Sequence, residues 1–236
     1  MARCLACRSD RTSRSDRTCW SDTTVIPLDS QVAVVKAIVF DLDGTLISFR
    51  EPYENVLEQT FESVVGTSRS VWVETYDEAF FDLFMALESN PVERAFEHVA
   101  STEDEFEIDS SLLAAQLHSY ECELSETPPS LEADLYRLRD EGYALAVLTN
   151  GVNEWQRVKL RSAGIETHFD AVVASYEAGA HKPDLAPFRL LESRLDADSY
   201  AMVGDSDADV EGAKSAGWMA HRYDGGGFGT LPAAIE

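Results

Sequence analysis

The feature that most constrains the fold of this 236-residue chain is a nearly unbroken run of β-branched and apolar residues, VAVVKAIVF, over residues 32–40. Such a run is typical of a strand buried on both faces, as in a parallel sheet that is covered by helices on each side. A polar turn, DLDGT, follows it at residues 41–45. The run therefore predicts a central parallel strand with two carboxylates at its carboxyl end.

The later part of the chain alternates short apolar strands with helical patterns. We predict strands over residues 143–148, 171–174, 200–203 and 218–223, and helices over residues 131–141, 154–163, 186–195 and 208–216. Gly164 and Gly217 follow two of these helices, where glycine supplies the left-handed C-terminal cap. Strands that alternate with helices of about ten residues predict an α/β fold with a doubly wound parallel sheet.

Residues 50–128 interrupt this alternation. Apolar and aromatic residues recur there at helical spacing: Leu57, Phe61, Trp72, Tyr76, Phe80, Phe84, Phe96, Val99, Leu113 and Leu117. We predict an inserted all-helical module, with the aromatic stripe as its core and not as a ligand site. The predicted domains are a flexible extension (1–30), an α/β core (31–49 and 129–236) and the helical module (50–128).

The first 30 residues contain few apolar side chains, so they cannot bury enough surface to offset the entropy lost on ordering. Cys4, Cys7 and Cys19 resemble part of a zinc knuckle, but a fourth ligand is missing because the first histidine is His98. A solvated tail, or a segment upstream of the functional domain, is the alternative interpretation.

The charge balance limits the partners of the protein. The chain has 43 acidic and 19 basic residues, a net charge of −24, and residues 51–128 alone hold 19 acidic and 2 basic ones. This surplus argues against nucleic acids and anionic membranes as partners. Only 4 of the basic residues are lysines, and an acidic, lysine-poor composition suggests adaptation to concentrated salt, which screens self-repulsion.

The four cysteines do not form a disulfide framework in a chain of this length. No apolar stretch approaches the roughly 18 residues of a membrane span, and the first residues lack the apolar run of a secretory signal. We therefore expect a cytoplasmic protein.

Polar residues follow the predicted strands, where an open parallel sheet places its binding site. They are Asp41 and Asp43 after the first strand, Thr149, Asn150 and Gly151 after the second, Lys182 in a loop, and Asp205 and Asp209 after the fourth. Alternation along a strand sends Asp41 and Asp43 the same way, and a spacing of four places Asp205 and Asp209 on one helix face. We expect Asp207 to cap that helix.

These motifs resemble those of the haloacid dehalogenase superfamily of phosphohydrolases. The four motifs of that family appear in order as DLDGT at 41–45, Thr149, Lys182 and GDSDAD at 204–209, and the resemblance covers about residues 35–225. It implies a Rossmann-like core, and the 108 residues between Asp41 and Thr149 leave room for the helical cap found in one subclass. Converging carboxylates also repel one another unless a divalent cation neutralises them, and an all-oxygen site suits Mg²⁺.

The resemblance implies a role for each site residue. Asp41 would be the nucleophile that forms an aspartyl-phosphate, and Asp43 the general acid and base. Thr149, with Asn150 and Gly151 beside it, would bind the phosphate together with Lys182. The metal would bind Asp41, the backbone carbonyl of Asp43, and Asp205, with Asp209 as a further ligand, a partner of the ligands or a structural residue. We interpret His181 as part of the loop structure.

The expected function is Mg²⁺-dependent hydrolysis of a small phosphomonoester. Asp43 favours this reaction, because the dehalogenases of the family do not keep an aspartate at this second position. The segment over residues 149–170 looks like that of a branch with nucleotide and sugar-phosphate phosphatases, and residues 46–56 and 90–91 are expected to set specificity. The alternatives are a haloacid dehalogenase, a phosphomutase, or a binding module that kept the fold without the activity.

Overall fold

The computed structural model describes residues 36–104 and 107–235. The predicted extension (1–30), with Cys4, Cys7 and Cys19, lies outside the described residues, as do the first residues of the predicted strand 32–40. The one cysteine among the described residues, Cys122, is a free thiol that is partly buried.

The elements of the α/β part agree with the sequence prediction to within one residue at each predicted end that the structure describes. The strands are β1 Lys36–Phe40, β2 Ser48–Phe49, β3 Ser125–Glu126, β4 Ala144–Thr149, β5 Ala171–Ala174, β6 Ser199–Gly204 and β7 Met219–Arg222. The helices are α1 Tyr53–Val65, α2 Ser70–Met85, α3 Pro91–Thr102, α4 Ser110–Leu124, α5 Leu131–Asp140, α6 Asn153–Ser162, α7 Ser175–Ala178, α8 Leu185–Arg194 and α9 Asp207–Ala216, with short 3₁₀ turns η1 Glu166–His168 and η2 Ala233–Ile235. No described helix is long and apolar enough to cross a membrane.

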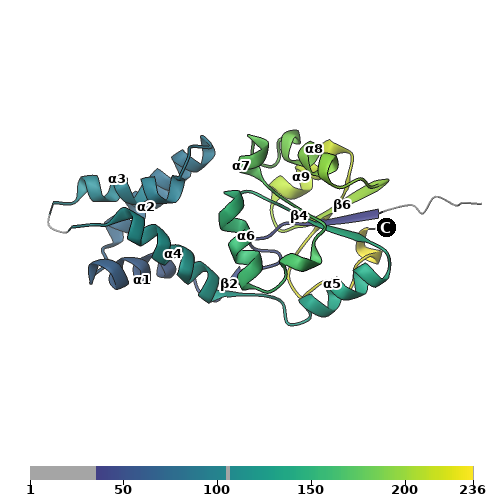
Figure 1. Cartoon of the computed structure of the whole chain (residues 1–236), viewed down its shortest axis with the longest axis horizontal. Helices are drawn as coiled ribbons and strands as arrows, with labels where there is room; N and C mark the ends of the chain where they lie inside the picture. The colour runs from purple at the N-terminus through teal and green to yellow at the C-terminus, as the bar shows by residue number, and fades with distance from the viewer. Residues whose placement is uncertain (1–35, 105–106, 236) are drawn as a thin grey trace, which may run out of the picture. The chain divides into compact units, whose positions relative to one another are not determined.

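Strand β1 lies at the centre of a five-stranded parallel sheet with the order β5-β4-β1-β6-β7. Both faces are covered, α5 and α6 lying on one side and α8 and α9 on the other (Figure 1). Ile38 and Phe40 therefore point into one core and Val39 into the other, and all three are fully buried. This confirms the doubly wound parallel sheet and explains why the β1 run is apolar at nearly every position.

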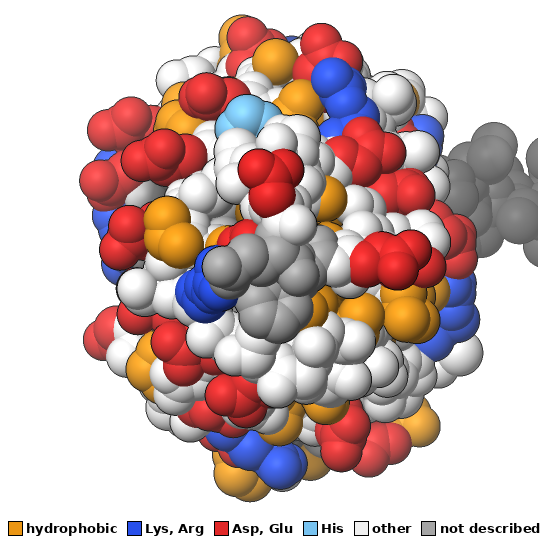
Figure 2. Space-filling model, turned by 90° about the vertical axis from the view of Figure 1, so that its left-hand side faces the viewer, with side chains coloured by type: hydrophobic (Ala, Val, Ile, Leu, Met, Phe, Trp, Pro, Cys, Tyr) orange, Lys and Arg blue, Asp and Glu red, His pale blue; other side chains and the backbone are white. Residues whose placement is uncertain are grey.

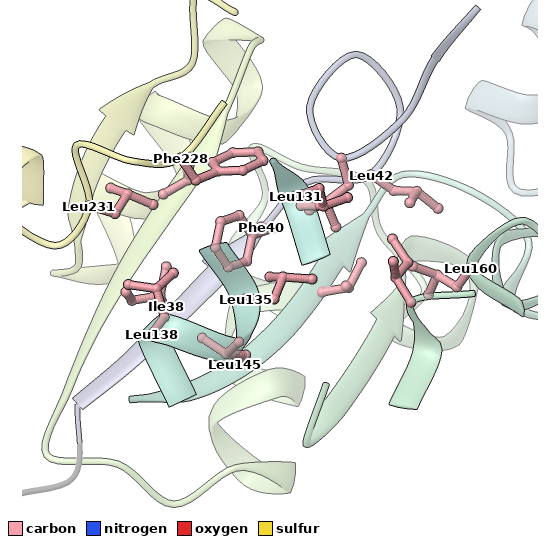
Figure 3. Close-up of a cluster of buried hydrophobic side chains, with 14 of the residues drawn as sticks. Ile38, Phe40, Leu42, Leu131, Leu135, Leu138, Leu145, Leu160, Phe228 and Leu231 are labelled. Carbon is pink, nitrogen blue, oxygen red and sulfur yellow. The ribbon is translucent and has the colours of Figure 1, made fainter. Parts of the chain in front are cut away.

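The first core packs side chains of β1 and β4 against α5, α6 and the C-terminal segment. Figure 3 shows Phe40 facing Leu135 and Phe228, and Phe40 and Phe228 meet edge to face with ring centroids 5.2 Å apart. Burial of each such side chain contributes roughly 1.5–3 kcal/mol. This core fixes the position of β1, and with it the turn that follows the strand.

Helices α1 to α4 pack on one another around a separate core (Figure 1). Phe61, Trp72, Tyr76 and Phe96 are buried there, as the aromatic stripe predicts, whereas Phe80 and Phe84 are only partly buried. The two-residue strands β2 and β3 pair antiparallel where the helices join the rest of the chain. Sequence periodicity does not reveal this pair, because two residues are too few to show a period.

The surface of this helical module is strongly acidic. Glu54, Glu58 and Glu62 on α1 are exposed, and α2 exposes further carboxylates. Figure 2, which faces this side of the molecule, shows Asp and Glu side chains spread over the surface in excess of Lys and Arg, with apolar side chains between them. Apolar residues of the four helices form the core and the acids lie outside it, as expected of amphipathic helices, although Val71, Phe81, Met85 and Leu112 are exposed.

Candidate active site

Three neighbouring parallel strands end side by side and bring the predicted residues together. Asp41 directly follows β1, Thr149 ends β4, and Asp205 directly follows β6. The backbone N–H of Asp41 donates to the carbonyl of Val203 at 2.9 Å, which continues the sheet by one residue. Gly44 turns the chain with φ +83°, and a Cβ there would lie 2.5 Å from a carboxylate oxygen of Asp205, so only glycine fits this close approach.

The ammonium group of Lys182 lies between two buried carboxylates. Its Nζ donates to Oδ1 of Asp41 at 2.7 Å, to Oδ1 of Asp209 at 2.6 Å and to the carbonyl of Leu148 at 2.8 Å. The Lys182 side chain is 2% exposed and that of Asp209 is 0% exposed. All three protons of the ammonium therefore have an acceptor, which a buried cation requires.

This arrangement raises the pKa values of both Asp41 and Lys182. Burial, the nearby Asp209 and, to a smaller extent, Asp43 raise the pKa of the Asp41 carboxyl from 3.8 to about 7, although Lys182 opposes the shift. Burial acts to lower the pKa of Lys182, but the carboxylates of Asp41 and Asp209 outweigh it and the pKa is raised. Lys182 thus stays a cation, and a second positive charge near Asp41 would favour its carboxylate form.

Asp209 has protein donors at both of its carboxylate oxygens. Oδ1 accepts from Lys182, and Oδ2 accepts from the backbone N–H of Ser206 at 3.0 Å and from its hydroxyl at 2.5 Å. Ser206 and Asp209 form a capping box at the start of α9. The prediction that Asp207 caps this helix is therefore wrong: Asp207 is the first helical residue, and its exposed carboxylate pairs with Arg222.

One group of acidic side chains in the described part of the chain is arranged so that it could hold a metal ion. Carboxylate oxygens of Asp41, Asp205 and Asp209 lie within 4.8 Å of one another. Asp205 is exposed and accepts a hydrogen bond from the Thr45 hydroxyl at 3.2 Å. An all-oxygen donor set that is open on one side fits a hard divalent cation that keeps several waters.

Asp43 is held by two residues that sequence reasoning did not identify. Its Oδ1 accepts from Nζ of Lys159 at 3.0 Å, and its Oδ2 accepts from Nε2 of Gln156 at 2.7 Å. Both donors belong to α6 and are buried. Gln156 also donates to the Thr149 hydroxyl at 2.9 Å, so one amide links Asp43 to the end of β4.

Lys159 extends this network to the helical module. Its Nζ lies 3.2 Å from a carboxylate oxygen of Glu121 on α4, which is 4% exposed. Glu121 also accepts from the hydroxyl of Tyr53 at 2.6 Å and from the indole N–H of Trp155. The two carboxylates beside Lys159 outweigh the effect of burial and raise its pKa, so Lys159 carries a positive charge.

Asn150 and Gly151 help to shape the loops around the site. The Asn150 side chain accepts from the backbone N–H of Lys182 at 2.8 Å and donates to the Lys182 carbonyl at 3.3 Å. The backbone N–H of Gly151 donates to the hydroxyl of Ser175 at 2.9 Å. These contacts hold the Lys182 loop against the end of β4, and the contact of both residues with substrate stays a prediction.

His181 contacts the helical module. Its two ring nitrogens lie 2.8 Å from the Ser175 hydroxyl and 2.7 Å from the carbonyl oxygen of Phe84, and the ring stacks on that of Phe84. This agrees with its interpretation as loop structure and adds a contact with α2.

A cavity of about 250 Å³ opens beside Asp43. Its wall combines residues of the α/β core with residues of the helical module: Asp43, Phe49, Tyr53, Phe80, Phe84, Pro91, Val92, Glu121, Asn150, Gly151, Val152, Trp155, Gln156 and Lys159. Phe49, Tyr53 and Pro91 belong to the segments that we expected to set specificity. A second cavity, of about 660 Å³, opens beside Asp205 and the glycines at 225–227.

The comparisons with known proteins agree with this geometry. A family model described as haloacid dehalogenase-like hydrolase matches residues 35–217. The chain belongs to this family of hydrolases.

Two curated relatives are phosphatases. Phosphoserine phosphatase from Thermus thermophilus is 46% identical over 101 residues, which is 42% of this chain and 41% of that protein. Phosphoglycolate phosphatase from Mesorhizobium japonicum is 32% identical over 188 residues, or 76% of this chain and 78% of the relative. Among solved structures, the hydrolase YfnB from Bacillus subtilis, bound to magnesium, shares the fold with a TM-score of 0.62 at 23% identity, covering 79% of this chain and 87% of that one.

The structure brings together every residue that sequence reasoning placed at the strand ends, but Lys159, Gln156 and Glu121 were missed. Lys159 and Gln156 lie within a helix whose pattern indicates an ordinary amphipathic surface. The sequence contained one indication that Lys159 has a specific role, because the chain has only 4 lysines. Glu121 gave no such signal among the many acids of residues 51–128.

The raised pKa of Asp41 predicts a pH dependence of stability in EDTA. Because the folded state prefers the protonated form, the stabilisation associated with it is present below the unfolded pKa and is lost as pH rises toward 7. Asp41→Asn lacks this titration. Between pH 5 and pH 8 the free energy of unfolding of the wild type should therefore fall by roughly 2–3 kcal/mol relative to that of Asp41→Asn, as measured by urea denaturation. Asp207→Asn, at an exposed carboxylate, should show no such trend, and a flat difference for Asp41→Asn would refute the shift.

Lys182 should be essential for stability when no metal is added. Lys182→Met leaves Asp41 and Asp209 buried without a cation, so we expect a loss of about 3–5 kcal/mol in the free energy of unfolding at pH 8 in EDTA. The loss should shrink at pH 5, where Asp41, whose pKa is raised, can take up a proton. The matched control is Lys214→Met, which removes an exposed lysine on α9. Equal losses in both variants at pH 8 would contradict the assignment.

Proposed function

We propose that the protein is a Mg²⁺-dependent phosphatase that hydrolyses a small phosphomonoester through an aspartyl-phosphate on Asp41. The observation that carries the proposal is the position of Asp41 at the end of β1, paired with buried Lys182 and near Asp43, which lines the cavity. A carboxylate nucleophile with a fixed cation and a second carboxylate beside it suits a two-step transfer of a phosphoryl group. The phosphatase names of both curated relatives support the reaction class.

In the first step the Oδ2 of Asp41 attacks phosphorus, because Oδ1 accepts the hydrogen bond from Lys182. The new bond joins Oδ2 to phosphorus, and the bond from phosphorus to the leaving oxygen breaks. Asp43, in its protonated form, gives its proton to that oxygen and becomes a carboxylate. The positive charge of Lys182 balances the negative charge on the phosphoryl oxygens, and the Thr149 hydroxyl donates a hydrogen bond to one of them.

In the second step water attacks the phosphorus of the aspartyl-phosphate. Asp43 now accepts a proton from the water, the bond from phosphorus to Oδ2 breaks, and inorganic phosphate leaves. Asp41 returns to a carboxylate and Asp43 to its protonated form, so the cycle closes without a further reactant. Gln156 and Lys159 hold the Asp43 carboxyl in place through both steps.

The donor set near Asp41 supports a magnesium site. The Asp41 side chain, the Asp43 carbonyl and Asp205 would hold the ion, and YfnB, which shares the fold, is described as bound to magnesium. Bound Mg²⁺ would neutralise charge on the phosphoryl group and favour the carboxylate form of Asp41. We assign Asp209 to the positioning of Lys182, because both of its oxygens already accept hydrogen bonds from the protein.

We also propose that residues 50–128 act as a cap over the site, on the α/β core of residues 31–49 and 129–236. Phe80, Phe84 and Glu121 of the helical module line the cavity beside Asp43, which supports this role. A small phosphorylated metabolite is the proposed partner. The cytoplasmic location and the adaptation to concentrated salt stay predictions.

Two conservative substitutions test the mechanism. Asp41→Asn removes the nucleophile, so we expect kcat for p-nitrophenyl phosphate with Mg²⁺ to fall by about 10⁴-fold or more. Asp43→Asn removes the acid and base and should lower kcat for an alkyl phosphate by about 10²–10⁴-fold. The matched control is Asp207→Asn, an exposed aspartate beside the site, which should keep wild-type activity.

Phosphate release that survives Asp41→Asn would reject the nucleophile. Full activity of Asp43→Asn would reject the acid and base role. Activity on 2-chloropropionate, with none on any phosphate ester, would identify a dehalogenase instead, and binding of phosphate esters without turnover would favour a non-catalytic module.

A further inference from the structure

We infer that the enzyme prefers phosphomonoesters whose leaving group is uncharged and has a flat apolar part, and that it discriminates against leaving groups with a second negative charge. The inference rests on the proposed phosphatase function and names the substrate class for the same site. It is drawn from the chemistry of the cavity beside Asp43.

The position of Asp43 decides where the leaving group lies. In the proposed mechanism Asp43 protonates the leaving oxygen, so the rest of the leaving group must extend from that point. The cavity of about 250 Å³ begins at Asp43 and has Asn150 and Gly151, at the end of β4, on its wall. The second cavity, of about 660 Å³, has no wall at Asp43, so the first cavity is the space available to a leaving group that Asp43 protonates.

The wall of this cavity is mainly aromatic. Phe49, Tyr53, Phe80, Phe84 and Trp155 contribute rings, and the Phe80 and Phe84 rings stack with centroids 5.4 Å apart. The polar atoms of Tyr53 and Trp155 both donate to Glu121, and both residues contribute to the wall of the cavity. Ring faces favour a flat apolar group, which can stack on them or meet them edge to face.

The charges of the cavity oppose a second anion. Among the described residues that line it, Lys159 is the one cation, and its Nζ lies 3.0 Å from Asp43 and 3.2 Å from Glu121. In the proposed first step Asp43 is protonated, so the charge of Lys159 is already balanced by Glu121 and no cation of the wall is left over for the ligand. An anionic leaving group would lose its hydration without gaining a free cation, which costs binding energy.

This property would distinguish the chain from a relative. Phosphoglycolate, for which the Mesorhizobium relative is named, carries a carboxylate on its leaving group. At 32% identity most positions differ between the two proteins, so the lining residues are free to differ as well. The charges that line the cavity therefore predict a preference against anionic leaving groups, which the name of the relative does not imply.

The direct test compares two esters that differ by one charge. We expect kcat/KM, with Mg²⁺, to be at least about tenfold higher for phenyl phosphate than for 4-carboxyphenyl phosphate. Equal values, or a higher value for the carboxylated ester or for phosphoglycolate, would overturn the inference while the phosphatase function stands. If neither these esters nor p-nitrophenyl phosphate nor phosphoglycolate is hydrolysed, the proposed function itself fails.

A charge variant tests the physical cause. Glu121→Gln removes one of the two carboxylates beside Lys159, so the kcat/KM ratio of the carboxylated to the uncarboxylated ester should rise about tenfold. The ratio is insensitive to a general loss of folded enzyme. Glu123→Gln, which removes an exposed carboxylate from the same helix, should leave the ratio unchanged. An unchanged ratio in Glu121→Gln would refute the role of the cavity charge.

A ring variant tests the apolar part. Phe80→Ala should lower kcat/KM for phenyl phosphate relative to glycerol 1-phosphate by about tenfold, because the second ester has an uncharged leaving group without a ring. Phe81→Ala is the matched control, since Phe81 lies on the same helix, is 62% exposed and does not line the cavity. An equal effect on both esters would show that the ring of Phe80 does not select the substrate.

Discussion

The buried ammonium group of Lys182 is the interaction on which the rest of the site depends. Without it, Asp41 and Asp209 would be two carboxylates close together in a dry environment with no cation to offset their repulsion. Lys182 keeps them in contact and connects the end of β1 to the start of α9. Lys182, Asp41 and the capping box of α9 thus form one connected group, and a change in any of them affects the other two.

A second charged chain links the core to the helical module. Asp43, Lys159 and Glu121 alternate in sign, so each carboxylate is paired although both lie close to an apolar cavity. The local charges also explain how a protein with a net charge of −24 could bind an anionic substrate, although the net charge alone suggests that anions are repelled. The exposed acids act over distances that salt screens, whereas Lys182, backbone donors and a bound cation would act over a few ångströms.

The sequence predicted the structure correctly where a local pattern of residues fits only one kind of element. The apolar run ending at Phe40 predicts a strand buried on both faces, and DLDGT predicts the turn that follows it. The close approach of Asp205 to Gly44 in that turn is visible only in the structure. The sequence was misleading at Asp207, because Ser206 and Asp209 cap α9 as a pair. It did not reveal that Lys159 pairs with Glu121, because this contact depends on how α4 packs against α6. No local pattern encodes a contact between residues 38 positions apart in the chain.

Trapping the covalent intermediate tests directly whether Asp41 is the nucleophile. Asp43→Asn should still form it from p-nitrophenyl phosphate, whose leaving group needs no proton, but should hydrolyse it slowly because the general base is missing. After an acid quench, peptide mass spectrometry should find one phosphoryl group on the peptide that contains Asp41, and none after the further substitution Asp41→Asn. A phosphoryl group on another residue, or turnover of this ester by Asp43→Asn at the wild-type rate without any labelled peptide, would contradict the central claim that Asp41 is the nucleophile.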